Sequence, residues 1–476
     1  MDAVATPVPV DLRLPPEAPW PLRRKLEALA QFHLAGERLR DEVGHVAYLA
    51  LGPERLGPWL APRFVMVSSP RGAQDVLAGA DGAVDKYGAF HEEFRRLGTN
   101  IFNLAHDEWL PRKRALQPVF TKPRMTSYAG AMSDVAVETA ADWATAGRVE
   151  LQGATRALTT EVLGRALLGL PLGDRAPQLA ADFDVYSGYA MSRARRPVRA
   201  PLWLPTPARA RFRDAWDAMA SVAAEAIDRV RLDPGLDAPL VHQLLAARDP
   251  ETGRGLAEED LVADLVTFLL AGHDTTATTL AYALWQLGQH PDLQAAVAEE
   301  AEAVGSRVLA PEHVPALPLT VRVLHEALRL CPPAAGVGRQ AMRDVAVDGH
   351  RIPVGWNLVV NIYALHRDPS AWPDPERFDP DRFLPERAEG RSRWQFLPFG
   401  GGQRKCIGDH FAMLEATVAL ATLVRDLELS SEGDFEIAVG FTTRAGGPVP
   451  ARVRSRRPAG SGPSPRRASG GTGPGS

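Results

Sequence analysis

Cysteine is scarce in this sequence: only Cys331 and Cys406 occur among 476 residues. Two cysteines exclude a disulfide framework, and they also exclude a metal site built from several cysteine ligands. A lone cysteine is usually a small buried residue without chemistry. A functional role for either cysteine therefore needs a specific argument from its surroundings.

Long apolar runs are also missing. No stretch of about 18 apolar residues occurs, which excludes a typical transmembrane helix. Residues 1–21 are rich in proline, and they lack the basic start and continuous apolar segment of a signal peptide. We therefore expect a cytoplasmic protein with a proline-rich leader over residues 1–21.

Net charge is small. The formal charge of −4 does not indicate a general nucleic-acid binder. The segment 451–476 differs, because it carries six arginines and no acidic residue. Residues 456–476 are rich in glycine, proline and serine and cannot bury enough apolar surface to fold. We predict that they form a disordered tail, with polyanion binding as the weaker interpretation.

Internal repeats are absent as well, and the apolar pattern is mostly helical. Helical spacing is found over residues 22–41, 107–229 with a break at 195–207, 256–289, 292–304, 319–330 and 406–425. Strand-like runs occupy 45–51 and 63–67, and Asp348-Gly349 predicts a hairpin turn. Residues 368–399 are irregular. The pattern predicts a mainly α fold with a small β-rich part, in one catalytic domain over residues 22–455.

The residues around Cys406 make its position unusual. They run from Phe399 through three glycines, Gln, Arg and Lys to Cys406, Ile and Gly408. Glycines allow positive φ and a close approach to a flat ligand, and a cysteine near a helix start and cations is favoured as a thiolate. Such a thiolate suits the iron of haem. A structural cysteine, or a nucleophile with His410 as its base, is the alternative. A phosphate-binding loop is excluded by the spacing.

Polar residues interrupt the apolar helix predicted at 256–289. The segment 271–276 contains Gly272, Asp274 and Thr275. Acid and hydroxyl groups in a buried helix are costly unless they have partners or a task. Proton transfer is one interpretation. In the other, Thr275 bonds back to the preceding turn and Asp274 faces solvent. Gly272 weakens the helix and allows a distortion or the close approach of a ligand.

These two segments resemble the cytochrome P450 family. Residues 399–408 match its FxxGx[RH]xCxG signature, and residues 271–276 match its [AG]Gx[DE]T[TS] helix. The resemblance covers roughly residues 25–455. It implies the mainly α haem-thiolate fold and haem b as cofactor, with Cys406 as axial ligand and Phe399, Arg404 and Gly408 at the haem. It also implies that Asp274 and Thr275 form an acid–alcohol pair that relays protons to dioxygen.

A charged pair and a distant segment match further parts of the family pattern. Glu326 and Arg329 form its ExxR helix, where a spacing of three places both on one helix face. Pro375-Glu376-Arg377-Phe378 matches its PERF-like segment. The resemblance implies that Glu326, Arg329 and Arg377 form a buried charge network that locks the Cys406 loop.

Several cations match positions that hold haem propionates in the family. The resemblance implies that Trp109, Lys113, Arg339 and Arg404 do so here, although Lys113 replaces the usual arginine and Arg114 follows it. We also expect Arg112, Arg114 and Lys405 behind the cysteine. That face resembles the family's docking surface for an acidic electron donor.

Substrate contacts vary within the family. We expect them here from residues 86–103, 183–203, 268–271, 334–337 and 441–443. Their aromatic and aliphatic side chains suit an apolar substrate, with core packing as the alternative. A basic cluster, Arg193, Arg195, Arg196 and Arg199, precedes Leu202-Trp203-Leu204. We interpret it as a solvated loop, with attraction of an acidic ligand or lipid surface as the alternative.

The resemblance implies a haem monooxygenase, an oxidoreductase that inserts one oxygen atom from O2 into an apolar small molecule. Terpenoids, steroids, fatty acids and polyketides are all open. The chain ends about 70 residues after Cys406, so we expect no fused flavin reductase and a separate donor, such as ferredoxin with its reductase. We expect a monomer. The alternatives are a peroxide-driven or non-oxygenating enzyme of the same fold, which the Asp274-Thr275 pair disfavours, and a haem sensor.

Overall fold

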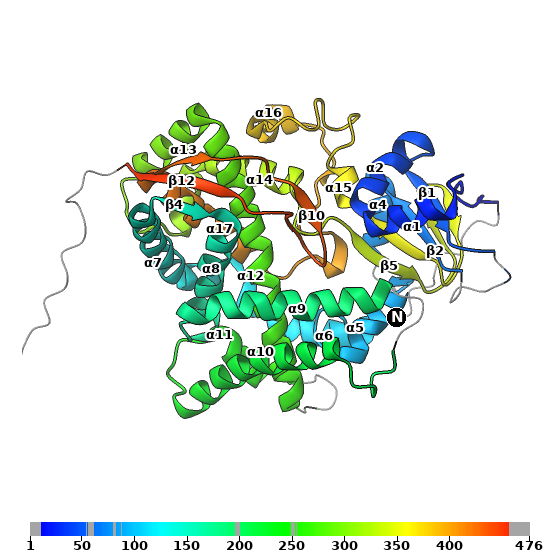
Figure 1. Ribbon diagram of the computed structural model, residues 1–476, viewed down its shortest axis with the longest axis horizontal. Helices are drawn as coiled ribbons and strands as arrows, with labels where there is room; N and C mark the ends of the chain where they lie inside the picture. Colours follow the sequence, from blue (N-terminus) through cyan, green and yellow to red (C-terminus); the bar gives the residue numbers. More distant parts are fainter. Residues whose placement is uncertain are drawn as a thin grey trace, which may run out of the picture.

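The computed structural model describes residues 11–53, 55, 61–79, 82–86, 88–195, 200–248, 253 and 255–456. Most of these residues are helical, and small sheets lie beside the helical body, which confirms the predicted fold class (Figure 1). The predicted tail lies outside the described residues except for Arg456, whose guanidinium donates to the Leu427 carbonyl.

Proline in the first turn starts many of the helices, as expected for a residue without an N–H. The segment predicted as one helix over 22–41 forms two helices that meet at Gln31. The α-helices are α1 Leu22–Ala30, α2 Phe32–Glu42, α4 Pro70–Leu77, α5 Gly88–Leu97, α6 His106–Leu116, α7 Lys122–Ala146, α8 Leu151–Leu163, α9 Ala176–Arg195, α10 Pro207–Leu232, α11 Pro239–Ala246, α12 Glu258–Gln289, α13 Pro291–Ala303, α14 Pro318–Leu330, α15 Ile362–Leu365, α16 Pro385–Ala388 and α17 Asp409–Asp426.

The largest sheet has the strand order β1-β2-β8-β5-β3, with only β2 and β8 parallel, and a second has the order β4-β12-β9. Two hairpins, β6-β7 and β10-β11, complete the set. The strands are β1 Val46–Ala50, β2 Arg63–Val67, β3 Val84–Asp85, β4 Arg148–Glu150, β5 Val337–Ala341, β6 Val345–Val347, β7 His350–Ile352, β8 Asn357–Val360, β9 Leu427–Ser431, β10 Ile437–Val439, β11 Thr443–Ala445 and β12 Pro450–Ser455.

Two local predictions can be checked on these strands. The hairpin at Asp348-Gly349 is confirmed, since both residues have positive φ, 46° and 77°, as a tight two-residue turn requires. The arginine-rich end begins within the fold. Residues 451–455 pair with β9, which fixes the start of the segment 451–476 in a sheet.

Helix α12 passes through the middle of the helical body (Figure 1). It is continuous from Glu258 to Gln289, so of the two possibilities that Gly272 allows, a distortion and the close approach of a ligand, the distortion is not seen. A Cβ at Gly272 would lie 2.7 Å from the Leu163 side chain of α8. The glycine therefore serves close packing of α12 against α8.

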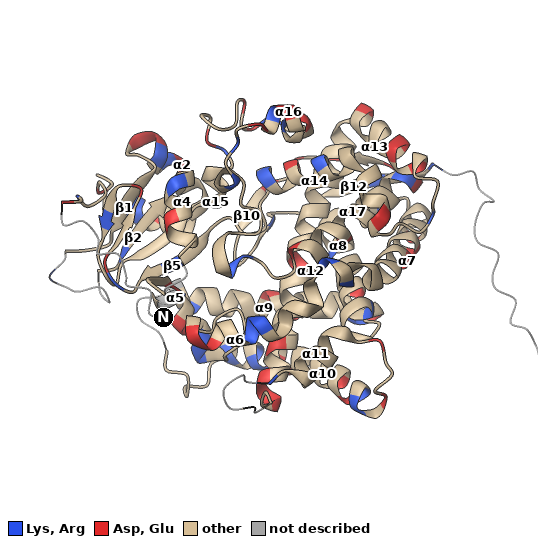
Figure 2. Ribbon diagram, turned by 180° about the vertical axis from the view of Figure 1, so that it is seen from behind, with Lys and Arg blue, Asp and Glu red and all other residues tan. Residues whose placement is uncertain are grey.

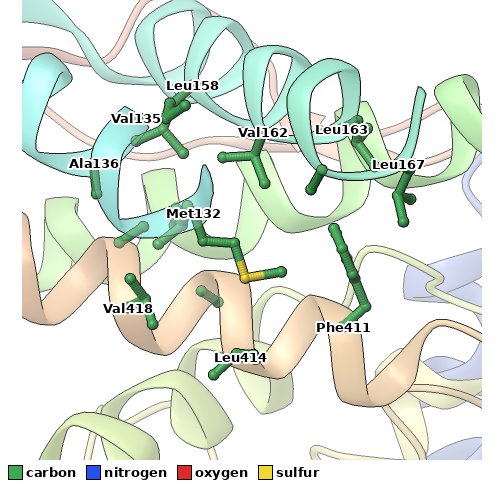
Figure 3. Packing of buried hydrophobic residues seen from close by; sticks show 14 of the residues in the cluster. Met132, Val135, Ala136, Leu158, Val162, Leu163, Leu167, Phe411, Leu414 and Val418 are labelled. Atoms are coloured by element: carbon green, nitrogen blue, oxygen red, sulfur yellow. The ribbon is translucent and has the colours of Figure 1, made fainter. Parts of the chain in front are cut away.

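Helix α17, which follows Cys406, is anchored in the core. Figure 3 shows its apolar side chains against those of α7 and α8. The contributing residues include Met132, Val135, Leu158, Val162, Phe411, Leu414 and Val418. This packing fixes the helix on which the Cys406 loop ends.

Part of the proline-rich leader also packs on the fold. Ala18 and Trp20 are buried, and the Ala18 N–H donates to the Tyr48 carbonyl at 2.9 Å. The Trp20 indole N–H donates to Glu42 of α2 at 2.8 Å. These contacts hold the described end of the leader against β1 and α2.

Candidate active site

The Cys406 loop is shaped by close contact with the rest of the chain. Gly400 and Gly402 have φ values of 70° and 68°, which favour glycine. A Cβ at Gly402 would overlap the carbonyl oxygen of Leu77 at the end of α4. The Cys406 N–H donates back to the Phe399 carbonyl at 3.0 Å and closes the loop. At Gly402 the glycine therefore allows protein packing, whereas a Cβ at Gly408 would meet only the Phe120 ring, 3.9 Å away.

Cys406 differs from the other cysteine in exposure. Its side chain keeps accessible surface, whereas Cys331 is fully buried. Although the side chain keeps accessible surface, the protein packed around the sulfur partly desolvates it; this desolvation is the largest influence on the Cys406 thiol and raises its pKa, as does Asp409, while the Gly408 N–H, Lys405 and Lys113 lower it. The neighbouring donors and cations thus act as predicted but do not outweigh burial. A metal cation on the sulfur reverses that balance, because a coordinating thiol is deprotonated.

The metal-binding capacity of the chain itself is small. No group of three or more His, Cys, Asp and Glu residues within the described ranges could hold a metal ion. An iron bound by Cys406 would therefore take most of its ligands from a prosthetic group. A thiolate with a planar tetrapyrrole fits this requirement.

Buried cations gather beside the loop and fit the carboxylates of such a group. Lys86, Arg339 and Arg404 lie close enough to affect one another, and Asp85 is the acid that offsets them. Burial is the main cause that lowers the pKa of Arg339 to about 10, with Arg404 adding to it. Arg404 donates to Asp85 at 2.9 Å. Three cations around one carboxylate leave a positive surplus suited to an anionic ligand.

Trp109 connects this surplus to α6. The Arg404 guanidinium lies 4.4 Å from the centre of its ring, and the Lys113 ammonium lies 5.0 Å from it. Lys113 also donates to the Gln403 carbonyl in the Cys406 loop. Arg114 is exposed. Of the two cations left open by the sequence, Lys113 is therefore the one that reaches the loop.

The polar residues of α12 form two kinds of contact. The Thr275 hydroxyl donates to the Ala271 carbonyl at 2.7 Å, as the structural interpretation expected. Asp274, however, is only 1% exposed and does not face solvent. Its Oδ1 accepts from Arg156 Nε at 2.8 Å and Nη2 at 2.5 Å, and its Oδ2 accepts from the Thr442 hydroxyl.

Two accessible residues of helix α12 mark the side of the helix that a ligand can reach. Ala271 is exposed and Thr275 half-buried, whereas the helix residues on either side of this pair are mostly buried. Ala334, in a segment predicted to contact substrate, is exposed between the buried Pro333 and Ala335. Small accessible side chains are suited to lining a ligand site.

A buried ion network supports the Cys406 loop, but its third cation differs from the prediction. Arg329 donates to Glu326 twice, at 2.7 Å each, and both are fully buried. Arg382 Nε lies 3.3 Å from Glu326 Oε1. The Arg377 side chain is exposed, and only its carbonyl joins, accepting from Arg329 at 3.2 Å. The predicted role of the Arg377 charge is therefore wrong in this structure.

The network reaches the loop through His366. Arg329 donates to the His366 carbonyl at 3.0 Å, and His366 Nε2 accepts the Leu397 N–H at 2.9 Å. The Leu397 carbonyl accepts the Gly400 N–H at 3.0 Å. Burial lowers the pKa of His366 to about 3, so its ring is neutral and can accept this bond. Continuous hydrogen bonding thus joins α14 to the glycine-rich turn.

The comparisons with known proteins agree with this geometry. The family model for cytochrome P450 matches residues 14–440. The chain belongs to the cytochrome P450 family. P450s carry haem b on an axial cysteine thiolate, so the predictions of fold, cofactor and haem monooxygenase activity on apolar substrates are confirmed.

Several curated P450s are similar over most of their length. Cyclooctatin synthase of Streptomyces melanosporofaciens is 36% identical, over 76% of this chain and 80% of the relative. Cyclooctat-9-en-7-ol 5-monooxygenase of the same organism is 31% identical, over 87% and 91%. Pentalenene oxygenase of Streptomyces avermitilis is 30% identical, over 87% and 89%.

The basic face of this P450 is smaller than predicted. Arg112 lies 3.1 Å from Asp260 and 3.4 Å from Asp264, and its side chain is only 9% exposed. It binds α6 to α12, so it cannot belong to a docking face. Arg114 and Lys405 are exposed. Figure 2 shows the basic positions on α6.

The cluster at the end of α9 is also partly internal. Arg193 is buried, pairs with Glu93 of α5 and donates to the Ala200 carbonyl at 2.8 Å. It is therefore a structural residue. The side chain of Arg195 and residues 196–199 lie outside what the structure describes. Trp203, beyond them, is 80% exposed.

Sequence reasoning missed several residues of the site. Lys86 was grouped with substrate contacts, whereas its buried ammonium donates to the Phe102 carbonyl at 2.7 Å beside Arg339 and Arg404. Thr442 was likewise grouped with substrate contacts and Arg156 was not singled out, although they are the partners of Asp274. The sequence offered one signal for Lys86, its position directly after the acidic Asp85.

No helix in the described chain is long and apolar enough to cross a membrane.

Proposed function

We propose that Cys406 is the axial thiolate ligand of the haem in this P450 monooxygenase. The observation that carries the proposal is the accessible Cys406 side chain in a hydrogen-bonded glycine loop, beside a surplus of buried cations. The fully buried Cys331 lacks that access. Bound haem supplies oxygen activation, which the thiolate favours by donating electron density.

The absorption spectrum of the reduced, carbon monoxide-bound protein tests this assignment. We expect a main band shifted strongly to the red relative to a histidine-ligated haem. Cys406→Ser should lose the shifted band, and Cys331→Ser is the matched control that should keep it. A shifted band that survives Cys406→Ser would overturn the assignment.

We assign the propionate contacts to the cations around Trp109. Arg339 and Arg404 are buried on one side, and Lys113 reaches the loop from α6. Lys86 adds a further buried ammonium. Phe399 and Gly408, as predicted, would lie against the ring itself. Replacing Lys86 with Met should lower haem retention, measured as haem released to an acceptor protein, whereas Arg114→Met should leave it unchanged.

We assign proton transfer to Asp274 and Thr275. Thr275 is the more accessible of the two. Its hydroxyl donates to the Ala271 carbonyl, and this hydrogen bond must break before the hydroxyl can donate its proton to another acceptor. Asp274 lies behind it in the buried interior and can replace that proton. Positioned donors of this kind typically contribute roughly 10²–10⁴-fold to rate.

We propose a terpenoid as the substrate class. Pentalenene and cyclooctat-9-en-7-ol appear in the names of two relatives, and an aromatic cluster formed by Phe94, Phe102, Phe183 and Phe441 offers apolar ring surface. Spectral titration with these two compounds, a fatty acid and a steroid tests the class. Tighter binding of the fatty acid or the steroid would overturn it.

We propose that a separate ferredoxin and its reductase supply the electrons. We also propose that the enzyme is monomeric and cytoplasmic. The exposed Arg114 and Lys405 support docking of an acidic partner. Lys405→Ala and Arg114→Ala should raise the KM for ferredoxin and weaken its salt dependence, with substrate affinity unchanged. Light scattering of the purified enzyme checks the oligomeric state.

A further inference from the structure

The hairpin β10–β11 places two neighbouring residues in different surroundings. Phe441 at its tip belongs to the aromatic cluster, with ring centres 5.4 Å from Phe94, 5.6 Å from Phe102 and 6.2 Å from Phe183. These partners come from α5, the segment after it, and α9. Thr442, the next residue, instead points its hydroxyl to Asp274 on α12.

Thr442 and Arg156 together occupy both oxygens of the Asp274 carboxylate. Arg156 takes Oδ1 with two N–H groups, and Thr442 takes Oδ2 with its hydroxyl. Asp274 is 1% exposed. The two Arg156 N–H groups fill Oδ1, whereas the Thr442 hydroxyl takes one lone pair of Oδ2 and stabilises its negative charge, so withdrawing Thr442 would make Oδ2 a better proton acceptor.

The Thr442 contact is the easier of the two to open. Arg156 makes two charge-assisted bonds to Asp274 and lies 3.5 Å from a second acid, Asp184. Breaking that buried ion pair would leave unpaired charge in the interior. Thr442 offers one bond from a neutral hydroxyl at the tip of a two-stranded hairpin.

The same hairpin also contacts the helix that covers the aromatic cluster. Arg444 donates to Asp184 of α9 at 2.5 Å, and Asp184 lies within reach of Arg156. Phe183, next to Asp184, contacts Phe441. A ligand that displaces Phe441 must therefore move a segment whose next residue holds Asp274.

We propose that the β10–β11 hairpin couples occupation of the aromatic cluster to proton transfer, because a ligand that displaces Phe441 withdraws Thr442 Oγ1 from Asp274 Oδ2. The freed oxygen can then receive a proton and pass it toward Thr275. Thr442 is a positioning residue in this scheme. The proposal rests on the assigned roles of Asp274 and of the aromatic cluster as substrate site.

Thermodynamic linkage gives this proposal a definite sign. If a bulky ligand must break the bond between Thr442 and Asp274, removing that bond in advance makes the ligand bind more tightly. Loss of one net hydrogen bond corresponds to roughly fivefold in affinity. A small ligand that leaves Phe441 in place gains nothing from the same change.

The experiment uses the haem-loaded full chain and two probes that both bind haem iron through an imidazole nitrogen. Clotrimazole is bulky and reaches into the substrate region, whereas imidazole is small. Thr442→Val should bind clotrimazole roughly fivefold more tightly and imidazole with unchanged affinity. Thr442→Ser, which keeps the donor, should match the wild type. Thr443→Val removes a neighbouring buried hydroxyl that makes no bond to Asp274 and is the matched control.

A second measurement follows the hairpin itself. Clotrimazole should accelerate hydrogen exchange at the Thr443 amide, which donates to the Pro333 carbonyl at 2.8 Å, and imidazole should not.

A third measurement uses turnover without substrate. Under these conditions Thr442→Val should release more peroxide per electron pair than the wild type. Equal clotrimazole affinity in Thr442→Val and wild type, or exchange unaffected by clotrimazole, would overturn the proposal. Absence of any azole spectral shift would instead show that the protein holds no haem iron open to these probes, which would refute the proposed haem site rather than the hairpin coupling.

Discussion

Two buried carboxylates of this P450, Glu326 on α14 and Asp274 on α12, are paired with arginine and differ in what their partners contact. Glu326 receives Arg329 twice and the Asp379 N–H at 2.9 Å, with Arg382 at 3.3 Å. Arg329 donates onward to main-chain carbonyls in the buried interior. Each partner of Glu326 is held in turn by further fixed groups.

The surroundings of Asp274 lead instead to partly exposed elements. Arg156 reaches Asp184, and Asp184 reaches Arg444; the side chains of Asp184 and Arg444 are 37% and 42% exposed. The Thr442 contact comes from a short hairpin. The same kind of ion pair is thus joined to main-chain groups of the interior at Glu326 and to a hydroxyl from a short hairpin at Asp274. This difference in surroundings agrees with the structural role proposed for Glu326 and the role in proton transfer proposed for Asp274.

The largest effect should follow from breaking the Glu326 network. Glu326→Gln keeps the shape but leaves Arg329 and Arg382 buried without a countercharge, and the free energy of unfolding should fall by about 3–5 kcal/mol. Urea unfolding and haem content measure this. Glu27→Gln, in an exposed pair with Arg23, should change stability by less than about 0.5 kcal/mol. A stable, haem-loaded Glu326→Gln enzyme would contradict the structural role.

Asp274→Asn should separate activity from stability. Turnover should fall by roughly 10²-fold, because the acid proposed to return a proton to Thr275 is lost. The folded state should tolerate the change better than Glu326→Gln, since Arg156 retains Asp184 as a partner. Product formation per electron pair is measured beside urea unfolding on the same preparation. Loss of haem to the extent seen in Glu326→Gln would remove the distinction between the two carboxylates.

Arg382 and Arg377 should differ in how much each stabilises the folded protein through Glu326. Arg382→Ala should lower the free energy of unfolding by about 2–3 kcal/mol, because it removes a buried cation beside Glu326. Arg377→Ala should change it by less than about 0.5 kcal/mol, because its side chain is exposed. Thermal or urea unfolding decides between them. Equal effects would restore the arrangement predicted from the sequence.

A smaller effect concerns pH, because a histidine precedes each carboxylate, half-buried at His325 and buried at His273. Burial lowers the pKa of His325 and of His273 to about 4 from the usual 6.5. The folded pKa lies below the unfolded one, so each contributes stability above pH 6.5 that is lost as the pH falls toward 4. For His325 the loss between pH 7 and 5 should be about 2 kcal/mol.

The His325→Leu variant tests how much His325, the neighbour of Glu326, contributes to the loss of stability at low pH. The variant should lose about 2 kcal/mol less than the wild type between pH 7 and 5, whatever its stability at pH 7. Urea unfolding at the two pH values gives the difference. His273→Gln should reduce the pH dependence in the same direction, and an unchanged pH dependence in both variants would show that other groups govern acid unfolding.

Much of the helical framework could be predicted from periodicity, and the limits of prediction appear at particular residues. The sequence contains two similar segments, Pro375–Phe378 and Pro380–Phe383, each with an arginine before phenylalanine. Local pattern cannot decide which arginine meets Glu326, because the pairing joins residues about 50 positions apart. The structure selects Arg382 by burial.

The same limit applies to charge that is neutralised at a distance. Arg112 resembles its exposed neighbour Arg114 in sequence, but Asp260 and Asp264 of α12 hold it inside. Thr442 lies 168 positions from Asp274, and nothing local distinguishes it from Thr443. Motifs identify the residues that carry chemistry, whereas the residues that hold them are found through three-dimensional contact.

The spread of the haem site along the chain has a consequence for biosynthesis. The cations Lys86, Lys113 and Arg339 all precede Cys406 in the chain, and the Cys406 loop also needs Leu77 of α4 beneath Gly402. A nascent chain that ends before residue 406 therefore carries most of the cations assigned to the propionates but lacks the proposed axial cysteine. If Cys406 holds the iron as proposed, stable capture of haem must wait until residue 406 has been made, so a chain terminated before it could not retain iron.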